Sequence, residues 1–96
     1  MSAKRFKSVW DALEDTPSEA ANMKARAELM NEIIELIKEQ HLTQTQAAAR
    51  LCVTQPRVSD LMRGKIDLFS LDTLINMLAA VGRRVEIKVK KVAVAA

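Results

Sequence analysis

The sequence predicts a mainly α-helical domain of five helices, followed by one β-strand near the C-terminus. Apolar residues recur at helical spacing between residues 17 and 81, and Ser, Thr and Pro stand where helices commonly begin. After Gly82 the spacing changes to alternation, which is typical of a strand. We therefore expect an N-terminal arm or short helix (1–15), a helical domain (16–82) and a C-terminal strand and tail (83–96).

Length and composition indicate one small domain from a reducing compartment. The chain has 96 residues, 49% of them apolar, and its single cysteine allows no internal disulfide. No apolar run approaches the ~20 residues of a membrane span, and we see no signal-peptide pattern. Aromatic residues make up only 3% of the chain, which argues against stacking platforms for single-stranded nucleic acid. We expect a cytoplasmic protein with no membrane contact.

The net charge of +3 is unevenly distributed along the chain. Residues 42–65 carry a net charge of +3, whereas residues 18–41 and 66–81 each carry −2. A basic segment between two acidic ones is what a phosphate-facing surface requires.

The first 15 residues begin with a basic arm and then allow two interpretations. Ser8 can cap a short helix that Trp10 anchors, or Phe6, Ser8 and Trp10 can alternate as a strand.

A long helix is expected next, because Thr16 can cap it and Pro17 suits its first position. No Gly or Pro interrupts it before His41. Two apolar stripes predict that its second half is nearly surrounded by protein, and its Ala-rich first half is expected to pack on a second subunit.

Residues 43–64, TQTQAAARLCVTQPRVSDLMRG, predict two short helices that meet at a tight corner. Thr43 and Gln46 have the spacing of a capping box for the first helix. Thr54 can cap the second, Pro56 lies in its first turn, and Gly64 can end it in the left-handed conformation. The core under the corner is expected to contain Ala47, Ala48, Leu51, Val53, Val58, Leu61 and Met62.

Polar side chains near the front of the second helix are expected to point away from this core together: Gln55, Arg57, Ser59 and Asp60. Such residues suit base edges, because Gln binds adenine, Arg binds guanine and Ser can donate or accept. This arrangement is typical of a helix-turn-helix, whose second helix lies in the major groove. An ordinary helical corner with a solvated polar face is the alternative.

After Gly64 a loop leads to a further helix, which Ser70 can cap and Gly82 can end. Leu68 and Phe69 are expected to anchor the loop in the core. The buried side of the helix is expected to consist of Leu71, Leu74, Ile75, Leu78, Ala79 and Val81.

The alternating residues Val85, Ile87 and Val89 predict a half-buried strand. A lone strand cannot satisfy its own hydrogen bonds, so we expect it to pair antiparallel with the same strand of a second copy. These three residues are then dimer contacts. Pairing with residues 4–10 of the same chain is the alternative.

No pattern in the sequence points to catalysis. There is no Ser/His/Asp set, no metal-ligand spacing and no glycine loop for phosphate. His41 is expected at a helix end and Cys52 in a structural role. We therefore expect no enzyme, no metal and no cofactor.

From Glu32 to Val89 the chain resembles the Xre/Cro-type helix-turn-helix family, and more closely its host-inhibition-of-growth (HigA-like) antitoxins. The phrases TQ-x-x-x-A, TQPRVSDLMRGK and FSLDTL carry the resemblance. It implies a five-helix, lambda-repressor-like fold and a homodimer on a palindromic operator in double-stranded DNA. It also implies a repressor of its own operon that neutralises a RelE-like ribonuclease toxin.

One residue departs from the family pattern. Cys52 stands where the family usually has Gly in the turn. A non-glycine residue at positive φ is uncommon, so the turn is either strained or differently shaped.

The resemblance also implies DNA contacts at matching positions. Gln44 resembles a phosphate-binding Gln that braces Gln55, the first base-reading residue. Many relatives have a polar residue at the position of Pro56, so Pro56 is expected to read fewer bases there. The set of expected DNA-binding residues is Thr43, Gln44, Thr54, Gln55, Pro56, Arg57, Ser59, Asp60, Arg63 and Lys65, the last two as backbone contacts.

These observations favour a sequence-specific transcriptional repressor, associated with the nucleoid, that acts as the antitoxin of a type II toxin–antitoxin operon. The alternatives are an Xre-type or phage-like regulator without a toxin, and a helical module that sequesters a protein partner.

Overall fold

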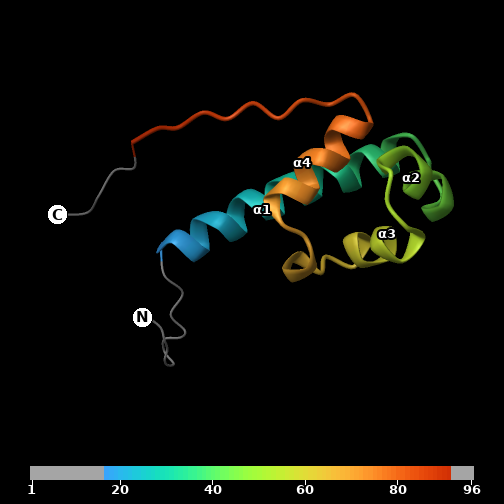
Figure 1. Cartoon of the computed structure of the whole chain (residues 1–96), viewed down its shortest axis with the longest axis horizontal. Coiled ribbons are helices and arrows are strands. Elements are labelled where there is room, and N and C mark those ends of the chain that lie inside the picture. Colours follow the sequence, from blue (N-terminus) through green and yellow to red (C-terminus); the bar gives the residue numbers. More distant parts are fainter. Residues whose placement is uncertain (1–16, 92–96) are drawn as a thin grey trace.

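The computed structural model describes residues 17–91, and four α-helices and one short 3-10 helix account for most of them (Figure 1). The expected Thr16 cap and both interpretations of residues 1–15 lie outside the described residues. The elements are α1 (Pro17–Glu39), α2 (Gln44–Leu51), α3 (Gln55–Met62), η2 (Ile66–Leu68) and α4 (Leu71–Ala80).

The long helix α1 is the element against which the others pack. It begins at Pro17 and runs unbroken for 23 residues, as the sequence predicted. Its fully buried residues all lie in the second half: Met30, Ile33, Leu36 and Ile37. Helix α4 packs along α1, and α2 and α3 form a corner beyond it (Figure 1). Among the described helices, none has the length and apolar character needed to span a membrane.

A single apolar core joins the corner to α1 and α4. Leu51, Val58 and Leu61 are at most 1% exposed, which confirms their predicted place under the corner. Ala47 and Ala48 are buried too, and their small side chains allow neighbouring helices to approach closely. The other buried members of this core are Met30, Ile33, Ile37, Phe69, Leu74, Met77 and Leu78.

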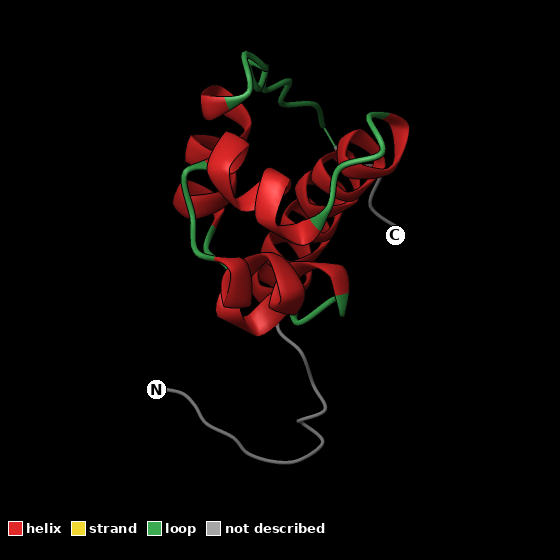
Figure 2. Cartoon of the chain, turned by 90° about the vertical axis from the view of Figure 1, so that its right-hand side faces the viewer, coloured by secondary structure: helices red, strands yellow, loops and turns green. Residues whose placement is uncertain are grey.

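Two features of the predicted fold need correction. The described residues form four α-helices, not five, since the candidate for the fifth lies outside them. Residues 83–91 form no strand, and Figure 2 shows only helices and loops in the described part. The physical reason is that a β-strand needs a neighbouring backbone to hydrogen-bond with, and no described segment of the same chain supplies one.

The burial of three apolar residues near α4 also differs from expectation. Phe69 anchors the loop at 1% exposure, but Leu68 is 46% exposed. On α4, Met77 is buried at 1% exposure, whereas Ala79 is exposed. Residues 74, 77, 78 and 81 follow one helical stripe, and residue 79 lies beside it.

Each of the four described α-helices is followed, within two residues, by a residue in the left-handed conformation. Gly64 and Gly82 have φ of 75° and 79°, as predicted, but His41 and Cys52 adopt φ of 53° and 60° without being glycine. Each end is closed by a backbone hydrogen bond from the next residue, and for α1 Leu42 N donates to Ile37 O at 3.0 Å. His41 is thus a helix-end residue, as expected.

Candidate nucleic-acid interface

The start of α2 is held by the predicted capping box. Gln46 N donates to Thr43 Oγ1 at 3.1 Å, and Thr43 N donates to Gln46 Oε1 at 2.9 Å. Gln44, the first residue of α2, is exposed. Within residues 17–91 no hydrogen bond joins its side chain to Gln55, and the bracing contact stays a prediction.

The turn between α2 and α3 is formed by Cys52 in the left-handed conformation, with φ of 60° and ψ of 42°. Both Cys52 N and Val53 N donate to Ala48 O, the latter at 3.0 Å. The turn therefore keeps the geometry that glycine favours although it contains cysteine. The Cys52 thiol is free and exposed.

Helix α3 is defined at both ends by local interactions. Thr54 caps it, because its hydroxyl accepts from Arg57 N at 3.4 Å, and Pro56 lies in the first turn. At the other end Gly64 N donates to Leu61 O at 2.9 Å and Lys65 N donates to Asp60 O at 3.1 Å. This pair of bonds is a Schellman motif, so α3 has a sharply defined length.

The outward surface of α3 is a ridge of four residues: Pro56, Ser59, Asp60 and Arg63. With 3.6 residues per turn, they fall within an arc of roughly 100° on the side opposite Val58 and Leu61. Pro56 and Arg63 are exposed, and Ser59 and Asp60 are half-buried. We refer to these four residues as the α3 ridge.

Arg57 lies elsewhere than expected. Residues two positions apart in a helix are separated by about 200° around its axis. Gln55 and Arg57 therefore occupy opposite flanks of α3. Gln55 is exposed, whereas Arg57 is half-buried, with its guanidinium carbon 4.4 Å from the centroid of the Phe69 ring. The expectation that Gln55, Arg57 and Ser59 project together is therefore wrong for Arg57. The Arg57–Phe69 contact is one that the sequence interpretation missed.

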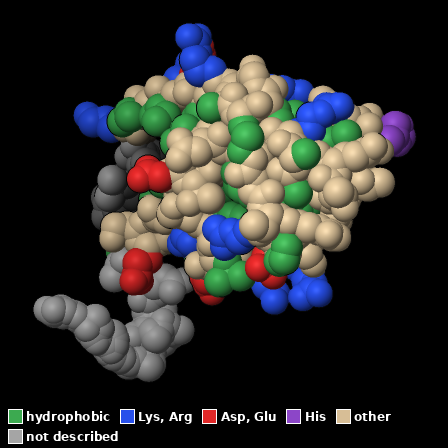
Figure 3. All heavy atoms as spheres, turned by 45° about the vertical axis from the view of Figure 1, so that its right-hand side comes forward, with side chains coloured by type: hydrophobic (Ala, Val, Ile, Leu, Met, Phe, Trp, Pro, Cys, Tyr) green, Lys and Arg blue, Asp and Glu red, His purple; other side chains and the backbone are tan. Residues whose placement is uncertain are grey.

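The basic side chains around the corner lie apart from one another and differ in their polar partners. Lys65 Nζ lies 3.7 Å from Asp60 Oδ1, and Arg50 Nη1 donates to Gln40 Oε1 at 2.8 Å. Arg63 forms no ion pair with any described residue and is exposed. On the face shown in Figure 3, Lys and Arg side chains lie at several places and do not merge into one patch.

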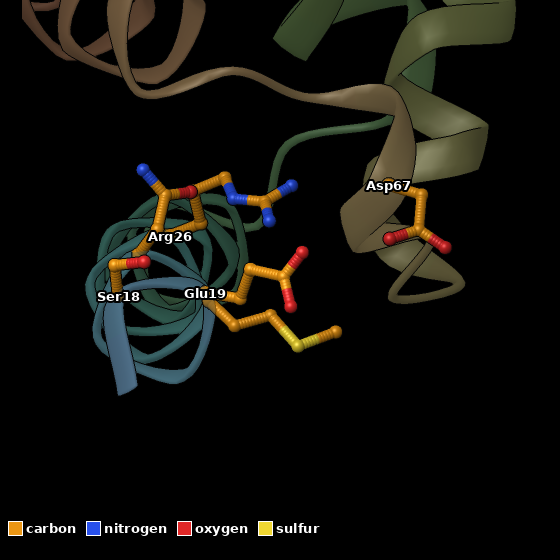
Figure 4. Close-up of a pocket in the computed structure, with 6 residues that line it drawn as sticks. Ser18, Glu19, Arg26 and Asp67 are labelled. Carbon is orange, nitrogen blue, oxygen red and sulfur yellow. The ribbon is translucent and has the colours of Figure 1, made fainter. Parts of the chain in front are cut away.

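An open hollow of about 530 Å³ lies between the first half of α1 and η2, and neither α2 nor α3 contributes to it (Figure 4). Arg26 lies at its wall and donates from Nη1 to Ile66 O at 3.1 Å, while its buried Nε has no hydrogen-bond partner among residues 17–91. Arg26 thereby ties η2 to α1. No group of His, Cys, Asp or Glu in the described part of the chain could hold a metal ion.

Comparisons with known proteins agree with this geometry. The family model described as a helix-turn-helix domain matches residues 12–90. A solved structure described as an XRE family transcriptional regulator is 34% identical, with a TM-score of 0.72, and the match covers 80% of this chain and 90% of that one. No curated protein matches the chain significantly.

Proposed function

Because this chain belongs to the helix-turn-helix proteins of the Xre type, we propose that it is a dimeric, sequence-specific DNA-binding repressor. The observation that carries the proposal is the position of the α3 ridge on a short helix with fixed ends. A helix with this geometry can enter the major groove of DNA without any rearrangement of the corner.

Individual roles follow from side-chain chemistry and position. We assign base contacts to Gln55, which is suited to adenine, and to Ser59 and Asp60 on the α3 ridge, since a carboxylate can accept from cytosine N4. Pro56 is assigned an apolar contact. Phosphate contacts are assigned to Arg63 of the α3 ridge and to exposed residues that precede or follow α3, namely Thr43, Gln44, Thr54 and Lys65.

The proposed dimer is supported by the tail, residues 83–91. Ile87 and Val89 are 76% and 93% exposed, and Val85 packs against the core. A hollow of about 400 Å³ separates the tail from α1 and α4, and its apolar lining includes Leu29, Ile75 and Ile87. Exposed apolar residues beside an apolar hollow are expected to be covered by a partner.

Antiparallel pairing of two tails about Ile87 gives the register with the best side-chain matches. It places Val85 opposite the partner's Val89 and Glu86 opposite the partner's Lys88, so both faces of the ladder contain favourable pairs. A shift of one residue in either direction would place Ile87 opposite a charged residue, Lys88 or Glu86 of the partner. Each strand would then supply the hydrogen-bond partner that a single chain lacks.

The antitoxin role is a further part of the proposal and is supported by the resemblance of residues 32–89 to that subgroup. A protein partner would find exposed apolar surface at the first half of α1 and η2, where Met23 is 40% and Leu68 is 46% exposed. The Met23 part of this surface lies at the end of α1 far from α2, whereas η2 follows α3 directly (Figure 1). We therefore assign the partner contact to the first half of α1, away from the α3 ridge. The alternative function, an Xre-type regulator without a toxin, would use the same DNA-binding surface.

DNA binding is tested by fluorescence anisotropy with the duplex upstream of the protein's own reading frame, in the presence of nonspecific competitor. We expect Arg63→Ala to weaken binding to all sequences and to reduce the salt dependence by about one counterion. Lys24→Ala is the matched control, because it removes one exposed charge from the distant half of α1. Equal binding by wild type and Arg63→Ala, or no binding by wild type, would contradict the proposal.

Dimer formation is tested by light scattering across protein concentrations. We expect Ile87→Asp to produce monomers, because burying a charge between two tails is costly. Asn31→Asp, on an exposed position of α1, introduces the same charge and should leave the dimer intact. A dimeric Ile87→Asp variant would refute pairing through the tail. Co-purification with the product of an adjacent small, basic reading frame tests the antitoxin role separately.

A further inference from the structure

We propose that Phe69 is a positioning residue for DNA recognition, which holds the Arg57 guanidinium ready to bind a pair of acceptor atoms on DNA. This inference deepens the proposed DNA-binding function and rests on it. It concerns a buried residue in the loop between η2 and α4, outside both helices of the corner.

The ring of Phe69 is a fixed platform. Its side chain is 1% exposed and belongs to the apolar core. Its backbone is held as well, because Phe69 N donates to Ile66 O at 3.2 Å. The same carbonyl accepts from Arg26 Nη1 at 3.1 Å, which ties this loop to α1. The ring therefore has little freedom to move with the side chain that lies over it.

Arg57 lies on this platform with its donors available. The 4.4 Å from its guanidinium carbon to the ring centroid is within the ~6 Å range of a cation–π contact. When a guanidinium stacks parallel to a ring, its five N–H groups point outward in its own plane and stay free to donate. The Arg57 guanidinium forms no hydrogen bond or ion pair within residues 17–91. These donors are therefore available to an acceptor from outside the chain.

The place of Arg57 in α3 favours an acceptor from outside the chain. It lies in the first turn of the helix, where the helix dipole disfavours a positive side chain. The helix dipole therefore gives no reason for a cation at this position. An anionic ligand would gain from both the guanidinium and the helix N-terminus. Duplex DNA presents suitable acceptor pairs on phosphate oxygens and on the O6 and N7 atoms of guanine.

The test is a double-mutant cycle on the full-length protein with Phe69→Leu, Arg57→Ala and the double variant. The probe is a duplex selected by the wild-type protein from a random-sequence pool. We expect Arg57→Ala to weaken binding about tenfold. Phe69→Leu should weaken it about threefold, because it keeps an apolar side chain but removes the ring face. In the Arg57→Ala background, Phe69→Leu should have almost no further effect.

Met77→Ala is the control for a merely structural effect, since Met77 is also 1% exposed and packs in the same core. All titrations are run at a temperature at which circular dichroism shows each variant to be folded. A repeated pool selection identifies the acceptor: loss of preference at one base pair indicates guanine, and a uniform loss of affinity indicates phosphate. Both results support the proposal.

Equal effects of Phe69→Leu with and without Arg57, or an equal loss with Met77→Ala, would overturn the positioning role while leaving DNA binding established. If the wild-type protein selects no site from the pool, the proposed function itself fails.

Discussion

Replacing Cys52 with glycine is expected to stabilise the protein, although it removes a side chain. Cys52 adopts φ of 60° and ψ of 42°, a conformation that costs a non-glycine residue about 1–2 kcal/mol. Its side chain is exposed, so its removal sacrifices little buried surface. Glycine loses more backbone entropy on folding than cysteine does, and this loss offsets about 0.4–1 kcal/mol of the strain that is relieved. The net gain is expected to lie between about 0 and 1.6 kcal/mol, with a central value of about 0.8 kcal/mol.

The measurement is urea unfolding followed by far-UV circular dichroism at one fixed protein concentration, since dimer formation would couple stability to concentration. The midpoint should rise with an unchanged slope, and the melting temperature should rise by about 2–8 °C. His41→Gly tests the same argument at the end of α1, where φ is 53°. The two gains should add, because the substitutions lie at different helix ends.

Gly64→Ala is the matched reverse substitution. Gly64 has φ of 75°, and an added Cβ would meet no heavy atom within 4 Å, so any cost comes from backbone conformation alone. We expect a loss of about 1 kcal/mol. If Gly64→Ala is destabilising while Cys52→Gly is also destabilising, the left-handed turn at Cys52 is not strained and the reasoning is refuted.

Three further predictions follow from the contacts described above. Thr54→Ala should lower the free energy of unfolding by about 1 kcal/mol through loss of the α3 cap, as measured in the same urea assay. Thr54→Ser keeps the hydroxyl and should retain most of the wild-type stability. Equal stability of the wild type, Thr54→Ala and Thr54→Ser would contradict the capping role. Lys65→Ala should weaken DNA binding at every sequence and reduce the salt slope by about one, as measured by anisotropy between low and high salt; a change confined to one base pair would instead indicate base reading. In a Cys52→Ser background, Ile87→Cys should form a disulfide-linked dimer on oxidation, seen on a non-reducing gel, because Ile87 meets its own copy in the proposed register. Val89→Cys should form no disulfide-linked dimer, because residue 89 faces the partner's Val85. A disulfide through Val89→Cys and none through Ile87→Cys would refute that register.

The elements of the corner could be predicted from the sequence because their signals are local. Thr43 with Gln46, and Thr54 with Pro56, act within a single helical turn, and no distant residue is needed to satisfy the N–H groups involved. Gly64 and Gly82 end their helices for an equally local reason. The buried stripe of Leu51, Val58 and Leu61 follows from helical spacing once the helix ends are known.

Tertiary structure alone decided the features that depend on distant neighbours. Arg57 has the sequence context of a recognition residue, but its place over Phe69 depends on how the loop after η2 returns toward α3. Leu68 and Phe69 are adjacent and both apolar, and the path of the loop, which Arg26 ties to α1 at Ile66, leaves Phe69 in the core and Leu68 exposed. The alternating tail has the pattern of a strand, yet a strand exists only when a second backbone supplies its hydrogen bonds. Periodicity specifies which face of a segment is apolar, whereas its partner is specified by three-dimensional packing.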